Sequence, residues 1–293
     1  MFANNDILRD AIDMHIHVGP DYTPRYGDAM KLAKEAKAVG MKAIIIKGHL
    51  MQSATAAHEA DTQIEDIRVF GGAALNDCNG GFNPRNVEAI AKSGGKMFWL
   101  PTVDAQYAID KAKESHWIGH YVDGSVFGHD RKGLCILDEK DNIKKDVLKI
   151  IDICKKYDAI LGTGHISPKE SLALAKACKA RGFTKLEVTH ANAWFEDFTI
   201  DVLKELVSLG AFISMAYGVC SMQNGGQHPK EIVDVIKVIG AENCILITDY
   251  GQVIHPSPSE GLRVYSSILM HFGITREEID YMIRVNPAKL LGL

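Results

Sequence analysis

Eight short apolar runs recur along the chain, and the regular spacing of their ends constrains the fold more than any other feature of the sequence. The runs cover residues 11–17, 42–47, 68–75, 97–103, 159–165, 185–190, 211–216 and 244–249. Their last residues are separated by 30, 28, 28, 62, 25, 26 and 33 positions. Because each strand–helix unit of a parallel sheet uses a similar number of residues, the near-constant intervals indicate repeated βα units.

The segments between these runs have the apolar period of amphipathic helices. The clearest helical segments are 28–39, 86–93, 145–157, 169–181, 199–209 and 229–239, and several are followed by a turn glycine: Gly40, Gly94, Gly182, Gly210 and Gly240. Eight strands in 293 residues without a linker predict an α/β fold, a (β/α)8 TIM barrel formed by residues 1–293 as a single domain. An open doubly wound sheet is the alternative.

The one long interval, between the fourth and fifth runs, predicts an insertion. It covers about residues 105–144 and includes a turn at Asp141-Asn142, which suggests a hairpin-like segment over one mouth of the barrel. Three histidines of this segment, His116, His120 and His129, are candidates for lining a lid.

Composition narrows the class of partner. The chain is 46% hydrophobic with a formal charge of −4, which is typical of a globular protein and excludes a disordered or low-complexity chain. Without a basic excess we expect a small-molecule substrate and neither nucleic acid nor a membrane as partner, with a homo-oligomer as an open possibility. The six widely spaced cysteines, and an N-terminus without a signal-like apolar stretch, favour a cytoplasmic location with reduced thiols.

The first run carries the sequence Asp13-Met14-His15-Ile16-His17. Strand side chains alternate between faces, so Asp13, His15 and His17 are expected on one face, with the two imidazoles about 7 Å apart. Such a pair can converge on one metal ion. The structural alternative is a pair of buried, hydrogen-bonded histidines.

Three later runs end on residues of the same chemical kind. The fifth ends at His165, the sixth at His190 and the eighth at Asp249. The carboxyl ends of barrel strands are where barrel active sites assemble, and imidazole and carboxylate are suitable ligands for a divalent ion such as Zn²⁺. The ordered set therefore predicts a divalent metal site, with Zn²⁺ as the first candidate and Mn²⁺ or Fe²⁺ as alternatives.

This ordered set resembles the amidohydrolase superfamily of metal-dependent hydrolases, and the closing segment VNPAKLLGL (residues 285–293) is similar to the Asn-Pro-Ala segment at the end of many members. The resemblance implies that His15 and His17 bind a first metal ion and that His165 and His190 serve the same or a second ion. It implies that Asp249 coordinates the metal and takes a proton from the attacking water. Asp249 and His190 are thus the predicted catalytic residues.

The fourth run departs from the two-metal form of that family, which carries a carboxylated lysine or a glutamate there. Lysine instead ends the second run, at Lys47. Lys47 is interpreted in three ways: as a carbamylated metal bridge, as a ligand for a substrate carboxylate or phosphate, or as the partner of an acid such as Asp13 or Asp104. One ion is slightly preferred to two. His49 and Arg25 are weaker substrate-binding candidates.

The reaction predicted from this resemblance is hydrolysis of an amide, lactam or lactone-like bond. A non-oxidative decarboxylase of the same superfamily is the main alternative, and a phosphoesterase with an initial HxH motif comes third. The non-enzymatic alternative is a catalytically degenerate metal-binding barrel. Ser167 and Glu170, which follow His165, are predicted to be structural, as the N-cap and N3 residues of a helix.

Overall fold

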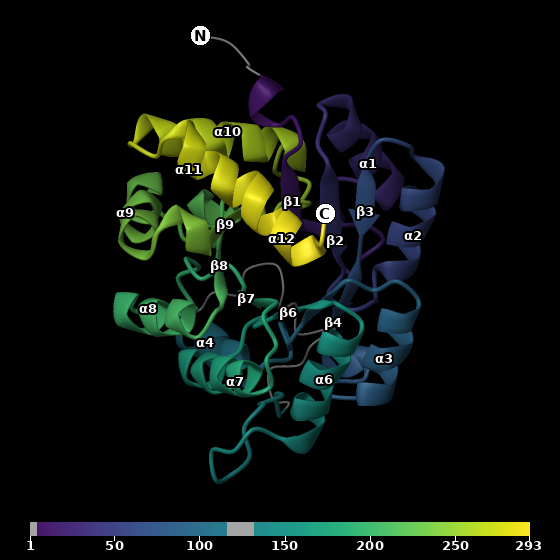
Figure 1. Ribbon diagram of the computed structural model, residues 1–293, viewed down its shortest axis with the longest axis vertical. Helices are drawn as coiled ribbons and strands as arrows, with labels where there is room; N and C mark the ends of the chain where they lie inside the picture. Colours follow the sequence, from purple (N-terminus) through teal and green to yellow (C-terminus); the bar gives the residue numbers. More distant parts are fainter. Residues whose placement is uncertain (1–4, 116–131) are drawn as a thin grey trace.

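The computed structural model describes residues 5–115 and 132–293, and these form the predicted α/β barrel (Figure 1). All eight predicted strands are present and every ladder between them is parallel. The third predicted strand is divided in two. The strands are β1 (Ile12–His17), β2 (Ala43–Lys47), β3 (Arg68–Phe70), β4 (Gly72–Ala74), β5 (Met97–Trp99), β6 (Ile160–Gly162), β7 (Leu186–Val188), β8 (Phe212–Ala216) and β9 (Cys244–Ile247).

The strand hydrogen bonds divide into two ladders, ordered β1-β2-β3 and β4-β5-β6-β7-β8-β9. The break falls at Gly71, where the Ser53 hydroxyl donates to the Ile46 carbonyl (2.7 Å) and accepts from the Gly72 amide (3.1 Å). The last strand returns to the first: the His17 amide donates to the Tyr250 carbonyl at 2.7 Å. Because the first strand contacts the segment that follows the last strand, the chain forms the predicted barrel and not the alternative open sheet.

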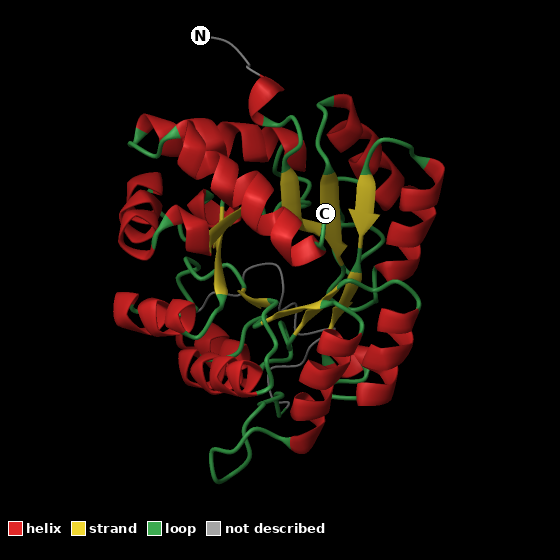
Figure 2. Cartoon of the chain, viewed as in Figure 1, coloured by secondary structure: helices red, strands yellow, loops and turns green. Residues whose placement is uncertain are grey.

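Helices surround the strands (Figure 2). They are α1 (Ala29–Ala38), α2 (Ala54–Gln63), α3 (Pro84–Lys92), α4 (Gln106–Ser115), α6 (Lys145–Lys156), α7 (Pro168–Ala180), α8 (Ile200–Ser208), α9 (Pro229–Ile239), α10 (Pro258–His271), α11 (Arg276–Asp280) and α12 (Asn286–Leu291). The six helical segments predicted above are confirmed. The five predicted turn glycines all have a positive φ, between +62° and +98°. No helix within the described ranges is both long enough and apolar enough to cross a membrane.

The core has two layers. One cluster, which we call the outer cluster, fills the space between strands and helices, with Ile44 and Phe98 on the strand side. The other, which we call the inner cluster, contains the alternate strand residues, such as Ile45 and Trp99, together with Leu290 of α12. In Figure 1, α12 lies across the strands. Its first residue, Asn286, donates to the Cys244 carbonyl at the start of β9 (2.7 Å), so the Asn-Pro-Ala segment anchors the end of the barrel opposite the strand carboxyl ends.

β1 contains a bulge that changes which of its side chains face the barrel centre. The register advances three residues from Asp13 to Ile16 while β2 advances only two. Before the bulge Met14 belongs to the inner cluster; after it Ile16 belongs to the outer one and His17 pairs in register with Lys47. The prediction that Asp13 shares a face with the two histidines is therefore wrong, because one extra residue shifts the alternation.

The predicted insertion is described only in part. α4 and residues 132–144 lie between β5 and α6, with an antiparallel bridge between Leu137 and Ile143 around the turn at Asp141. Residues 116–131, with His116, His120 and His129, lie outside the described residues.

Replacement of Ser167 with alanine is expected to lower the free energy of unfolding by about 1 kcal/mol. Ser167 and Glu170 form the predicted capping box at the start of α7: the hydroxyl accepts from the Glu170 amide, and the Glu170 carboxylate accepts from the Ser167 amide (3.0 Å). Urea unfolding measures the change. A much larger loss, or a change in bound metal, would contradict a purely structural role.

Candidate metal centre

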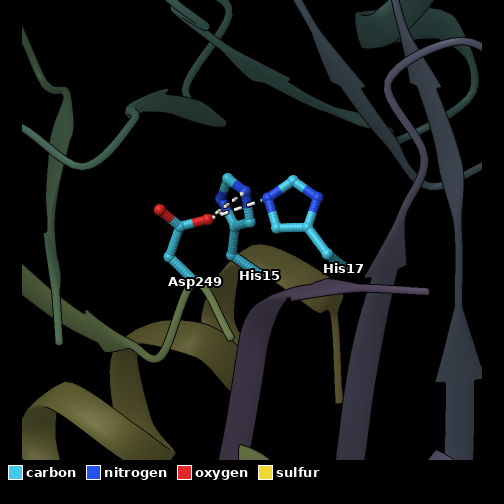
Figure 3. Close-up of side chains that lie close together, drawn as sticks. All are labelled: His15, His17 and Asp249. Carbon is cyan, nitrogen blue, oxygen red and sulfur yellow. Dashed lines mark hydrogen bonds and ion pairs between the residues drawn. The ribbon is translucent and has the colours of Figure 1, made fainter. Parts of the chain in front are cut away.

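Two predicted ligands from β1, His15 and His17, meet a third, Asp249, which follows β9 at the carboxyl ends of the strands (Figure 3). Nε2 of His17 lies 2.9 Å from Oδ1 of Asp249, and Nε2 of His15 lies 3.3 Å from the same oxygen. Both histidines are buried, whereas 19% of the Asp249 side chain is exposed. The three side chains, which we call the first cluster, offer ligand atoms that all lie within 4.8 Å of one another.

Backbone contacts between the first and last strands hold this cluster together. The Asp249 amide donates to the His15 carbonyl at 3.0 Å, and the His17 amide donates to the Tyr250 carbonyl. Asp249 has a φ of +55°, which is uncommon for a residue with a side chain and turns the chain directly after β9. The convergence therefore depends on strands that are more than 230 residues apart in sequence.

The protonation states suit a metal site. Burial, with the charge of Lys47 next, lowers the pKa of His15 well below 6.5, and burial with the charge of Arg25 does the same for His17. Burial opposes ionisation of Asp249, but its electrostatic interactions with the surrounding His15, His190 and Lys47 outweigh burial and lower its pKa. Two neutral imidazoles and one carboxylate therefore face each other at neutral pH, a donor set that fits Zn²⁺.

Lys47 ends β2 inside this site, fully buried, with Nζ 3.1 Å from Nε2 of His15 and 5.2 Å from the ring centre of Trp99. Burial lowers its pKa from 10.5 to about 8, although the charge of Asp249 acts in the opposite direction. The acid partners considered from sequence have other contacts: Asp13 accepts from the Thr248 amide at 3.2 Å, and Asp104 from the Asp77 amide at 2.7 Å.

The two weaker substrate-binding candidates also lie near the first cluster. The His49 ring stacks on that of His17 with centroids 4.7 Å apart, and its Nδ1 lies 2.9 Å from the Thr102 hydroxyl oxygen. Arg25 is held in the loop after β1 by Asp21, to which Nε donates at 2.9 Å, and only 1% of its side chain is exposed. Their contact with substrate stays a prediction.

The remaining predicted ligands form a second cluster with an acid that the sequence analysis missed. The rings of His165 and His190 have centroids 4.9 Å apart, and Nδ1 of His190 lies 3.5 Å from Oε1 of Glu196. These three residues offer ligand atoms within 4.8 Å of one another. Burial lowers the pKa of His190 to about 4 and raises that of Glu196 well above 4.5.

Glu196 follows β7 by eight residues and lies in a loop that also contains Trp194, Phe195 and Phe198. The sequence signal that could have identified Glu196 is its place among aromatic residues in the loop that follows a strand. A second missed acid, Glu187 on β7 itself, is buried and accepts from the Thr189 hydroxyl at 2.6 Å.

The fold is a parallel α/β barrel, and the side chains at the carboxyl ends of its strands form two groups that could hold a metal ion. The chain belongs to the family described as a family of unknown function (DUF6282), whose model matches residues 10–214. No curated protein matches the chain in sequence.

Solved structures share the fold over nearly the whole chain. An amidohydrolase from Pseudomonas aeruginosa is 9% identical with a TM-score of 0.65, covering 99% of this chain and 98% of its own. The probable dipeptidase PvdM from the same organism is 10% identical (TM-score 0.61; 98% and 96%). An amidohydrolase from Burkholderia multivorans, in a structure with bound zinc, is 14% identical (TM-score 0.59; 97% and 99%). At these identities the similarities establish the barrel fold.

Proposed function

We propose that the protein is a metal-dependent hydrolase of the amidohydrolase type, which cleaves an amide, lactam or lactone-like bond in a small substrate. The observation that carries the proposal is the first cluster, in which His15 and His17 of the first strand lie beside Asp249, which follows the last strand. The fold shared with amidohydrolases and with a probable dipeptidase supports the same reaction class. Zn²⁺ is the proposed ion, supported by the donor set and by the zinc in the Burkholderia protein.

Each residue of the first cluster has a distinct proposed task. A divalent ion held here supplies Lewis acidity and lowers the pKa of a water molecule toward about 7. His15 and His17 hold the ion from the buried side, where their low pKa values keep both imidazoles neutral. Asp249 is the group that solvent reaches, and its low pKa keeps it ionised, so it accepts the proton of the attacking water as general base.

The proposed substrate is small and carries an anionic group. Lys47 and Arg25 are two cations with buried side chains near the first cluster, and Arg25 is also paired with Asp21. Burial lowers the pKa values of His17 and His49, and the charges of both cations lower them further. Two cations in a water-poor site attract a carboxylate or phosphate group of a ligand. His49, stacked on His17, is proposed to shape the same part of the pocket.

Replacement of His15 with alanine is expected to remove one metal equivalent per chain and to reduce turnover more than about 100-fold, since even outer partners of metal ligands are worth about 10–100-fold. Metal content is measured by mass spectrometry after loading with Zn²⁺ and desalting. Turnover is measured on a panel of amides, lactams and lactones with carboxylate or phosphate groups, and release of CO₂ would identify a decarboxylase instead.

The matched control is His58→Ala, because His58 is an exposed histidine on α2. It should keep both the metal and the activity. Retention of all metal by His15→Ala would contradict the assigned site, and bound metal without turnover on any of these bonds would favour the non-catalytic barrel.

A further inference from the structure

Large apolar side chains gather at the end of the barrel where the first cluster lies. Of the nine that are exposed within the described residues, five lie in loops that follow strands: Met51 after β2, Trp194 after β7, Met222 after β8, and Val253 and Ile254 after β9. Single exposed apolar residues are common on any protein, whereas several around one mouth mark a binding surface. Trp194 and Met222 lie in neighbouring loops, because β7 and β8 are adjacent strands.

The turn after β8 supports the Trp194 ring. A Cβ added to Gly225 would lie 2.8 Å from Cδ1 of Trp194, so the indole lies directly against the Gly225 backbone. Gly225 and Gly226 have φ values of +103° and +63°, in the region that glycine adopts without strain. Met222 belongs to the same loop, and its Sδ lies 3.2 Å from a Cβ added to Gly226. Trp194 and Met222 therefore both contact this glycine turn.

Phe195 extends this apolar surface inward to the histidines that follow β6 and β7. Its ring meets that of Trp194 edge to face, with centroids 5.7 Å apart. The Phe195 centroid also lies 5.1 Å from that of His165 and 5.6 Å from that of His190. Trp194 is 37% exposed and Phe195 only 8% exposed, so aromatic rings continue from the protein surface to the candidate metal ligands. We call Trp194, Phe195 and Met222 the apolar wall.

We propose that the apolar wall binds an aromatic ring or alkyl chain of the substrate, while Lys47 and Arg25 bind its anionic group. The inference rests on the proposed function and narrows its substrate to an amphipathic molecule, a small carboxylate or phosphate with an apolar part. Lys47 ends β2 and Arg25 follows β1, whereas the wall follows β7 and β8. The cations and the wall thus come from different segments of the barrel mouth.

The continuity of the wall favours a small molecule over a protein partner. A partner protein, or a second copy of this chain, would contact the exposed Trp194 and Met222 but would not reach the buried Phe195. A substrate held at the metal centre meets Phe195 first and Trp194 beyond it. Small-molecule sites are typically lined by apolar and aromatic side chains, with a few polar groups that fix the orientation of the ligand.

The test measures the Kd of straight-chain carboxylates, from acetate to octanoate, for the zinc-loaded full-length protein by calorimetry. Each methylene group that the wall buries should lower Kd about fourfold. Trp194→Ala should reduce this factor to less than about twofold and leave the Kd of acetate unchanged. The control is Tyr281→Ala, because Tyr281 is an equally exposed aromatic residue (38%) in the π-helical segment Tyr281–Val285, away from the strand carboxyl ends. It should keep the full dependence on chain length.

A second variant and a spectroscopic measurement test the position of the indole. Gly225→Ala keeps Trp194 but displaces its ring, so it should weaken the dependence on chain length as Trp194→Ala does. The fluorescence of Trp194, obtained as the difference between the wild type and Trp194→Phe, should shift to shorter wavelength with octanoate and not with acetate. The reason is that an alkyl chain replaces water at the indole.

Equal Kd values for butanoate and octanoate in the wild type would overturn the inference. So would a dependence on chain length that both Trp194→Ala and Gly225→Ala retain. A change of oligomeric state in Trp194→Ala, with every Kd unchanged, would instead assign the exposed residues to a contact between copies and also overturn it. A dependence on Trp194 in a protein that hydrolyses none of the amides, lactams and lactones would support the wall and count against the proposed function.

Discussion

Replacement of Asp249 with asparagine is expected to lower kcat about 1,000-fold while metal bound at the first cluster is retained. Asparagine has the shape of aspartate and keeps one carbonyl oxygen toward Nε2 of His15 and His17, so a ligand atom stays in place. It cannot accept the proton of the attacking water. The rate should therefore fall far more than metal affinity.

The measurement combines single-turnover kinetics with metal analysis of the same preparation. The control is Asp146→Asn, because Asp146 is a half-exposed acid in the first turn of α6 and makes a surface contact with Lys149. It should change neither rate nor metal content. Full activity in Asp249→Asn would exclude this residue as the base, and loss of metal would make it chiefly a ligand.

Replacement of Gly251 with alanine is expected to lower the free energy of unfolding by about 3–5 kcal/mol, combining backbone strain with overpacking. Gly251 has a φ of +132°, and an added Cβ would lie 2.0 Å from the His17 carbonyl oxygen. That oxygen belongs to the strand end that positions the first cluster, so relief of the clash must separate β1 from the segment after β9. Reduced metal affinity should accompany the lost stability.

Urea unfolding of the metal-free protein separates the stability effect from the metal effect. The control is Gly273→Ala, because Gly273 has a φ of +104° but no described atom within 4 Å of an added Cβ. It should lose only the backbone contribution, about 1–2 kcal/mol. Equal losses in the two variants would mean that the contact with His17 has no importance for folding.

The barrel could be predicted because its signals are local. A strand and its helix are each recognisable from a short apolar period, and the near-constant interval from His17 to Lys47 and onward reflects the length of one βα unit. The capping box of Ser167 and Glu170 lies within four residues and was predicted for the same reason. The positions of the strands follow from these signals, and with them His165, His190 and Asp249, although the strands β6, β7 and β9 are shorter than predicted and end before these residues.

The composition of the candidate site could be predicted only in part. Glu196 was missed because no periodicity governs the direction of a side chain in a loop. The role of Lys47 stayed open among three interpretations, since its contact with His15 is made between neighbouring strands. The face of Asp13 was wrong because a bulge moves the alternation by one residue, and a bulge is set by pairing with the next strand.

The sequence by itself determined where the strands lie and which chemical groups stand at or just beyond their carboxyl ends, because the α/β alternation and the HxH pattern are properties of short segments. Only the tertiary structure decided which of those groups lie together in the first cluster and which lie in the second. The pairing of β1 with the segment after β9 brings Asp249 to His15 and His17, while the loop after β7 folds Glu196 against His190. The physical reason is that metal ligands are selected by distances of a few ångströms, which depend on strand register and loop packing between segments far apart in the chain.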